Sequence, residues 1–238
     1  MVGTGAKQAI ANAVLCLVNP GEEVIVPTPY WVSYSEVIKL AEGHPVYIPA
    51  TVEDEFKISP EQLEAAITDK TKLFLFSSPC NPTGSVYSRE ELAALVKVFE
   101  KYPNIYIISD EIYEHINFIE KHESIAQFPS INDRVVIING FSKAYAMTGW
   151  RIGYLAANKE IAQACEKMHG QITSGTCSIA QRAGIAAYEG GLESVIEMRD
   201  AFRKRRDLVY KLLKAIPGVK TNLPQGAFYF FPDISYYL

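Results

Sequence analysis

Cysteine is scarce in this sequence, and its few copies form no motif. The four cysteines are spread widely, without a C-x-x-C pair, at Cys16, Cys80, Cys165 and Cys177. The four histidines likewise show no spacing that indicates a metal site or a catalytic triad. We therefore expect neither a disulfide framework nor a bound metal, and we predict a reducing, cytoplasmic environment.

Long apolar runs and an excess of basic residues are also missing. No stretch approaches the roughly 18 apolar residues that a membrane-spanning helix needs, so no membrane partner is expected. The 23 basic and 27 acidic side chains give a formal net charge of −4. A nucleic-acid-binding face is not expected either, because neutralising phosphates requires clustered Lys and Arg. These absences favour a small-molecule partner.

What the sequence does contain is an alternation of short β-branched runs with segments of helical period. The chain has 238 residues, 48% of them hydrophobic, which is typical of a globular protein of one or two domains. Ser59 and Ser88 each begin a capping box that predicts the start of a helix. The alternation predicts a three-layer α/β/α fold with a mainly parallel sheet. The predicted strands are 24–26, 46–48, 73–76, 105–108 and 135–138.

The last third of the sequence changes character. Helical patterns follow one another at 161–169, 178–188 and 192–213, and strand signals return at 219–238. In the third helix, Val195, Phe202 and Val209 recur every seven residues and predict a stripe that faces the core.

Polar and aromatic residues follow four of the predicted strands. Trp31 follows the first, Asn81 the third, Asp110 and Tyr113 the fourth, and Lys143 the fifth. Ligands of open α/β sheets bind beyond the carboxyl ends of the parallel strands, so we expect these side chains to converge. An amine that forms a Schiff base, an acid that keeps a pyridine nitrogen protonated and an aromatic that stacks on the ring together indicate a pyridoxal 5′-phosphate site.

Two further features suit the phosphate of such a cofactor. The segment Gly3-Thr4-Gly5-Ala6-Lys7 opens the first helix and would present free backbone N–H groups at the positive end of its dipole. Arg151, eight residues after Lys143, would add a bidentate guanidinium.

These motifs resemble the class I pyridoxal-phosphate-dependent aminotransferases of fold type I. Residues 140–153, GFSKAYAMTGWRIG, are similar to the cofactor-attachment signature of that family over their whole length. The motifs at 29–34, 81–84 and 109–113 follow in the family's order and rough spacing, so the resemblance covers nearly the whole chain. Within the family, 170–181 and 224–229 look most like bacterial and plastid aspartate aminotransferases, including those that aminate prephenate.

The resemblance implies a role for each residue near the cofactor ring. Lys143 would form the Schiff base and then move the substrate's Cα proton, while Asp110 would pair with the pyridine nitrogen. Tyr113 and Asn81 would hydrogen-bond the ring oxygen, which makes Tyr113 the third catalytic residue of the prediction. Trp31 would stack on the ring, and Trp31 and Asn81 would also contact substrate.

The resemblance also implies a set of phosphate ligands. Gly5, Ala6, Ser142 and Arg151 would hold the phosphate, with Lys7 near them and able to reach a substrate's distal carboxylate. The implied reaction is a ping-pong transamination between L-aspartate or glutamate and 2-oxoglutarate or oxaloacetate, in a homodimer. Two alternatives remain open: an aromatic or prephenate aminotransferase, and a catalytically silent cofactor-binding fragment.

The resemblance finally predicts the domain organisation. Residues 1–215 would form the large cofactor-binding domain, and 216–238 would begin an incomplete smaller domain. The family's arginine for the substrate α-carboxylate has no match in this sequence, so we expect a truncated chain that lacks both ends of its relatives.

Overall fold

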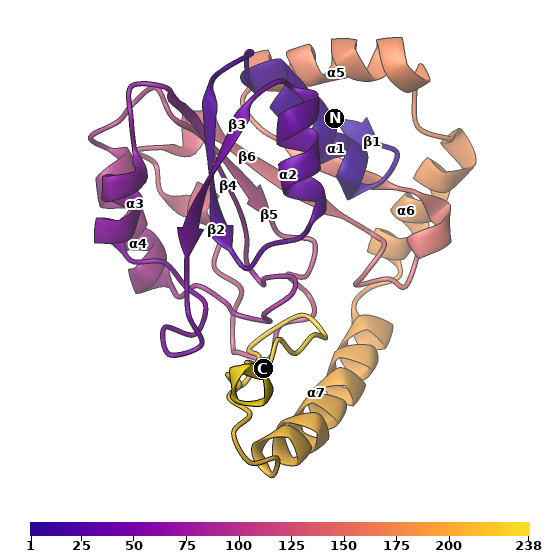
Figure 1. Cartoon of the computed structure of the whole chain (residues 1–238). Coiled ribbons are helices and arrows are strands. Elements are labelled where there is room, and N and C mark those ends of the chain that lie inside the picture. Colours follow the sequence, from indigo (N-terminus) through magenta and orange to yellow (C-terminus); the bar gives the residue numbers. More distant parts are fainter.

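The computed structural model describes all 238 residues and is built around one seven-stranded sheet (Figure 1). The strand order across the sheet is β1-β7-β6-β5-β4-β2-β3. Strands β2 to β6 pair in parallel, and β7 is antiparallel to both of its neighbours. The strands are β1 (Val2–Gly3), β2 (Glu23–Thr28), β3 (His44–Pro49), β4 (Thr71–Ser77), β5 (Tyr106–Asp110), β6 (Val135–Gly140) and β7 (Gly153–Ala156).

Helices cover both faces of the sheet. One face carries α3 and α4, and the other carries α1 with α2 and α5 packed beside it (Figure 1). No helix is long and apolar enough to cross a membrane. The helices are α1 (Ala6–Leu17), α2 (Ser33–Leu40), α3 (Pro60–Ala66), α4 (Arg89–Phe99), α5 (Lys159–Thr173), α6 (Ser178–Glu189) and α7 (Glu193–Lys214).

The core is divided by the sheet into two apolar layers. Along β4, Leu73 and Leu75 pack on the α1 side, whereas Phe74 and Phe76 pack on the α3 and α4 side. This alternation follows from the two-residue period of a strand, because successive side chains point to opposite faces. Both faces of the strand are therefore buried, and the three-layer α/β/α prediction is confirmed.

Local sequence signals mark most of the element boundaries correctly. All five predicted strand runs lie in β2 to β6, apart from Ile105, which precedes β5. Ser59 and Ser88 close complete capping boxes with Gln62 and Glu91 at the starts of α3 and α4. Strands β1 and β7 were not predicted, because runs of two and four residues carry too little period to be recognised.

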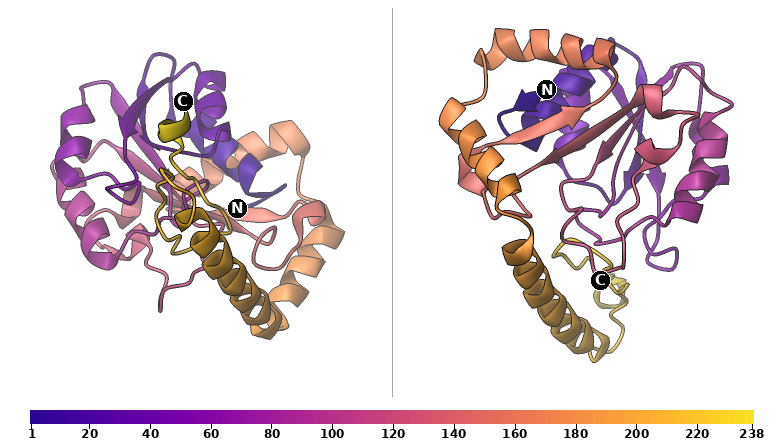
Figure 2. Two further views of the ribbon diagram at one scale, coloured as in Figure 1. Left: turned by 60° about the horizontal axis from the view of Figure 1, so that its bottom comes forward. Right: turned by 180° about the vertical axis from the view of Figure 1, so that it is seen from behind.

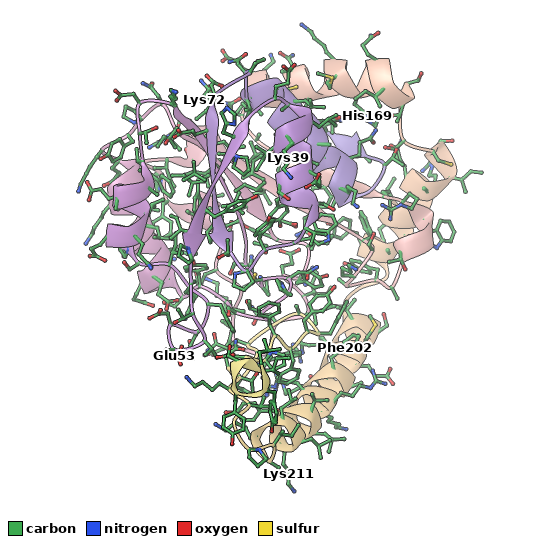
Figure 3. The ribbon with its side chains drawn as sticks, in the orientation of Figure 1. Lys39, Glu53, Lys72, His169, Phe202 and Lys211 are labelled. Carbon is green, nitrogen blue, oxygen red and sulfur yellow. The ribbon has the colours of Figure 1, made fainter.

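The prediction of a core-facing stripe along the third C-terminal helix is wrong for most of its length. Helix α7 extends away from the sheet (Figure 2), and only Val195 near its start is buried. Val209 is 38% exposed. Phe202, labelled in Figure 3, packs against the small buried cluster that contains Tyr113 and stacks on Phe228 with ring centroids 5.1 Å apart. The apolar residues of α7 do recur every seven positions, but beyond Phe202 no other element of the chain packs on this side of the helix and buries them.

The strand signals at 219–238 were also misleading. This segment forms only two isolated bridges, Asn117 with Gly226 and Lys220 with Asp233, and one 3₁₀ turn at Ser235–Tyr237. Pro224 and Pro232 interrupt the segment and lack the N–H that a strand ladder needs, so no continuous strand forms.

Candidate active site

One pocket gathers almost every residue that the sequence singled out. It lies at the carboxyl edge of the sheet, where Asp110 ends β5 and Lys143 follows β6. Of the predicted site residues, only Gly5 does not itself line the pocket. The lining residues are Ala6, Lys7, Trp31, Ser77, Asn81, Asp110, Ile112, Tyr113, Ser142, Lys143, Thr148, Arg151 and Tyr229.

One part of the pocket is built to receive an anion. Helix α1 begins at Ala6, and no side chain caps the N–H groups of its first turn. The Arg151 guanidinium donates to the Thr148 carbonyl at 2.8 Å and forms no salt bridge with a carboxylate. Gly5 has a φ of 84°, and a Cβ there would collide with that guanidinium. Free N–H groups and an unpaired guanidinium fit a phosphate group.

The Lys143 amine lies among aromatic rings. Its Nζ is 5.7 Å from the centroid of the Tyr113 ring and 5.5 Å from that of Phe228. Burial lowers the pKa of Lys143, and the Arg151 charge lowers it further, whereas Asp110 opposes the shift. A lowered pKa increases the fraction of neutral amine, which is the nucleophilic form.

Asp110 is buried and held by two hydrogen bonds. The Tyr34 hydroxyl donates to Oδ2 at 2.7 Å, and the Ile112 backbone N–H donates to Oδ1 at 3.2 Å. Burial raises the pKa of Asp110 to about 6, against the lowering effects of these bonds and of Lys143. The group is therefore mostly ionised at neutral pH, as the partner of a protonated pyridine nitrogen must be.

Three polar groups form a chain beside the amine. The hydroxyls of Tyr113 and Tyr229 are 2.7 Å apart, and Asn81 Nδ2 donates to the Tyr229 hydroxyl at 3.5 Å. Burial, and then the contact with Tyr229, raises the pKa of Tyr113. The phenol consequently keeps its proton at neutral pH.

The Lys7 ammonium lies over the Trp31 indole at the edge of the pocket. Lys7 Nζ lies 4.8 Å from the centroid of the Trp31 ring. Trp31 in turn meets Tyr34 edge-on, with centroids 5.7 Å apart and an interplanar angle of 85°. The positive charge and the flat aromatic thus form one wall of the pocket.

Sequence reasoning missed two tyrosines with a direct place in this arrangement. Tyr34 supports Asp110, and Tyr229 joins Asn81 to Tyr113. Both lie inside the family motifs at 29–34 and 224–229, but the resemblance implies no role for either. Ser77 and Thr148 also line the pocket without having been predicted.

The fold and the pocket define an α/β protein whose ligand site joins an anion cradle to a lysine amine and a buried carboxylate. Comparison with known proteins then identifies the family. The family model described as aminotransferase class I and II matches residues 1–237. The chain belongs to this family, as its motifs indicated.

Similar proteins carry consistent names. The chain is 50% identical over 236 residues to an aspartate/prephenate aminotransferase of Cereibacter sphaeroides. The alignment covers 98% of this chain and 59% of that protein. An aspartate aminotransferase structure from Rhizobium meliloti matches with a TM-score of 0.95 and 42% identity, over 98% of this chain and 58% of that one. An aspartate aminotransferase structure from Thermus thermophilus with maleate matches with a TM-score of 0.94 and 40% identity, over all of this chain and 62% of that one.

The family implies pyridoxal 5′-phosphate as the cofactor, and the donor set of the pocket fits it. The chain spans about 60% of the length of these relatives, between 58% and 62%.

Proposed function

We propose that this chain is the cofactor-binding part of a pyridoxal-phosphate-dependent aminotransferase that acts on L-aspartate or glutamate and the matching 2-oxoacids. The observation that carries the proposal is the pocket, in which the Lys143 amine, the Asp110 carboxylate and the uncapped start of α1 with Arg151 meet. Residues 1–215 would form the large domain and 216–238 the start of a second one. The working unit would be a homodimer, as the family resemblance implies.

The pocket residues divide the work of binding and proton transfer. Gly5, Ala6 and Arg151 would hold the phosphate, with Ser142 beside them. When bound, pyridoxal 5′-phosphate supplies a carbonyl that condenses with amines and a ring that accepts electrons. Lys143 Nζ would carry the proton that leaves the substrate Cα, because its lowered pKa makes the neutral amine accessible.

The remaining groups would orient and polarise the ring. Asp110 would hold a proton on the pyridine nitrogen through its ionised carboxylate, and Tyr113 and Asn81 would donate toward the ring oxygen. Trp31 would stack on the ring and limit its rotation.

An acidic substrate is favoured over an aromatic one. Lys7 places a cation on the Trp31 wall of the pocket, where it would meet a distal carboxylate. The Thermus thermophilus relative is described with maleate, a dicarboxylate, and the similar proteins above are named for aspartate. Prephenate, which the Cereibacter sphaeroides relative's name includes, is the second substrate candidate, because this 2-oxoacid also carries two carboxylates. The two half-reactions would follow a ping-pong order.

Two measurements test cofactor binding and catalysis separately. Purified chain is mixed with pyridoxal 5′-phosphate, reduced with borohydride and digested, and the labelled lysine is identified by mass spectrometry. We expect the label on Lys143 and its loss in Lys143→Ala; a label on another lysine would refute the assignment. Turnover of aspartate with 2-oxoglutarate then tests catalysis, and cofactor binding without turnover would mean that this chain alone is a binding module.

A further inference from the structure

The C-terminal segment at 224–229 is fastened to the pocket wall at several points. The N–H groups of Gln225 and Gly226 both donate to the Gly84 carbonyl, at 2.8 and 2.9 Å. Ala227 N–H donates to the Ile116 carbonyl at 2.8 Å. This segment is thus clamped between the turn that carries Asn81 and the loop that follows Tyr113.

This clamp places the Tyr229 hydroxyl between two groups assigned to the cofactor ring. Asn81 Nδ2 donates to it at 3.5 Å, and the Tyr113 hydroxyl lies 2.7 Å away. Both neighbours line the same pocket as Tyr229, with Lys143. The Phe228 ring, next in the chain, holds the Tyr113 ring edge-on with centroids 5.4 Å apart.

The direction of the Tyr113–Tyr229 hydrogen bond has a consequence for the pocket. A tyrosine hydroxyl has only one proton to donate. If Tyr113 donates it to Tyr229, none remains for a ligand. If Tyr229 donates instead, the bonds run from Asn81 to Tyr229 to Tyr113, and the Tyr113 proton is free to point into the pocket. Since Asn81 Nδ2 can only donate, the second arrangement lets each hydroxyl both accept and donate.

We propose that Tyr229 is a positioning residue that acts through Tyr113: its hydroxyl relays the Asn81 amide to Tyr113 and strengthens the hydrogen bond that Tyr113 donates to the cofactor's ring oxygen. The inference rests on the proposed cofactor, and it assigns a residue that the family motifs left without a role. Consecutive hydrogen bonds polarise one another, so each donor in such a chain is stronger than it would be alone.

The test is a spectrophotometric pH titration of the chain loaded with pyridoxal 5′-phosphate. A stronger donor at the ring oxygen stabilises its anionic form and lowers the pH at which the bound cofactor changes colour. We expect Tyr229→Phe to raise this midpoint by on the order of 0.3 pH unit. The shift is small because the substitution removes only the cooperative strengthening of the hydrogen bond from Tyr113 to the charged ring oxygen, not that bond itself. Tyr188→Phe is the matched control, because it removes a hydroxyl paired with Tyr154 at 2.9 Å outside the pocket.

A double-mutant cycle shows whether Tyr229 acts through Tyr113. In a Tyr113→Phe background the effect of Tyr229→Phe should vanish, since the relay then has no receiving hydroxyl. Should Tyr229→Phe fail to fold, 3-fluorotyrosine installed at position 229 keeps the hydroxyl but makes it a stronger donor, and the midpoint should fall.

An unchanged midpoint in Tyr229→Phe or in the fluorinated chain overturns the relay, as does an equal shift in the Tyr113→Phe background. Failure of the unmodified chain to take up the cofactor is a different result, which would refute the proposed function instead.

Discussion

The Tyr34 hydroxyl donates a 2.7 Å hydrogen bond to Asp110 Oδ2, and both side chains are buried. Tyr34 is the second residue of α2, on the α1 side of the sheet, whereas Asp110 ends β5. A helix on one layer therefore holds the carboxylate on which the pocket's electrostatics depend.

Tyr34→Phe should raise the pKa of Asp110 above its value of about 6, because the carboxylate loses the hydrogen bond that most opposes its burial. A hydrogen bond to a charged group contributes about 1.5–3 kcal/mol, which predicts a rise of about one pH unit or more. A carbon-13 NMR titration of the Asp110 carboxyl in the cofactor-free chain measures this pKa in the wild type and in the variant. Tyr47→Phe, which removes an exposed hydroxyl paired with Tyr30, should leave the midpoint in place.

Asp110 should also make the stability of the cofactor-free chain depend on pH. Burial raises the pKa of Asp110 from 3.8 to about 6, so between these pH values the folded state binds more protons than the unfolded state. The stabilisation that this proton provides is fully present below pH 3.8. That stabilisation is lost as the pH rises through about 6. Relative to the wild type, Asp110→Asn should therefore gain about 2 kcal/mol of stability between pH 4 and pH 8. Urea unfolding at both pH values measures this, and the exposed Asp69→Asn should show no such gain.

Gly5→Ala should weaken cofactor binding by at least about tenfold, which corresponds to about 1.4 kcal/mol. The methyl group would strike the Arg151 guanidinium, and a φ of 84° strains any L-residue with a side chain. Equilibrium dialysis with pyridoxal 5′-phosphate gives the dissociation constant. Gly170→Ala is the matched control: its methyl group meets nothing within 4 Å, and it should stabilise α5 by about 1 kcal/mol without changing binding. Equal affinities in the two variants would argue against the anion cradle.

Lys7→Gln should reduce the affinity of the cofactor-loaded chain for maleate by about tenfold, on the scale of one lost ion pair in a partly desolvated pocket. The affinity for a monocarboxylate such as butyrate should change much less, because only the second carboxylate would face Lys7. Competition calorimetry with both ligands measures the ratio. Lys39→Gln removes a cation paired with Glu36 on the surface and serves as the control. A parallel loss for both ligands would place Lys7 at the phosphate rather than at the substrate.

The sequence predicted the sheet well because buried parallel strands have a strong local signature. The run Leu73–Phe76 is apolar on both faces, and β4 is buried on both faces. The stripe through Val195, Phe202 and Val209 was as regular, but an amphipathic period states only that a face is apolar, not what will cover it. That is why the prediction for α7 was wrong beyond its first turns.

The layer architecture, the capped helix starts and the residues that follow the carboxyl ends of the strands could all be predicted from the sequence, since these features depend on neighbours a few positions away. Two contacts depend on the folded chain: Tyr34 donates a hydrogen bond to Asp110, and the hydroxyl of Tyr229, 116 positions after Tyr113, bonds to the Tyr113 hydroxyl. Such contacts arise from the packing of distant segments around the pocket, and no local period encodes which hydroxyl a buried polar group will meet.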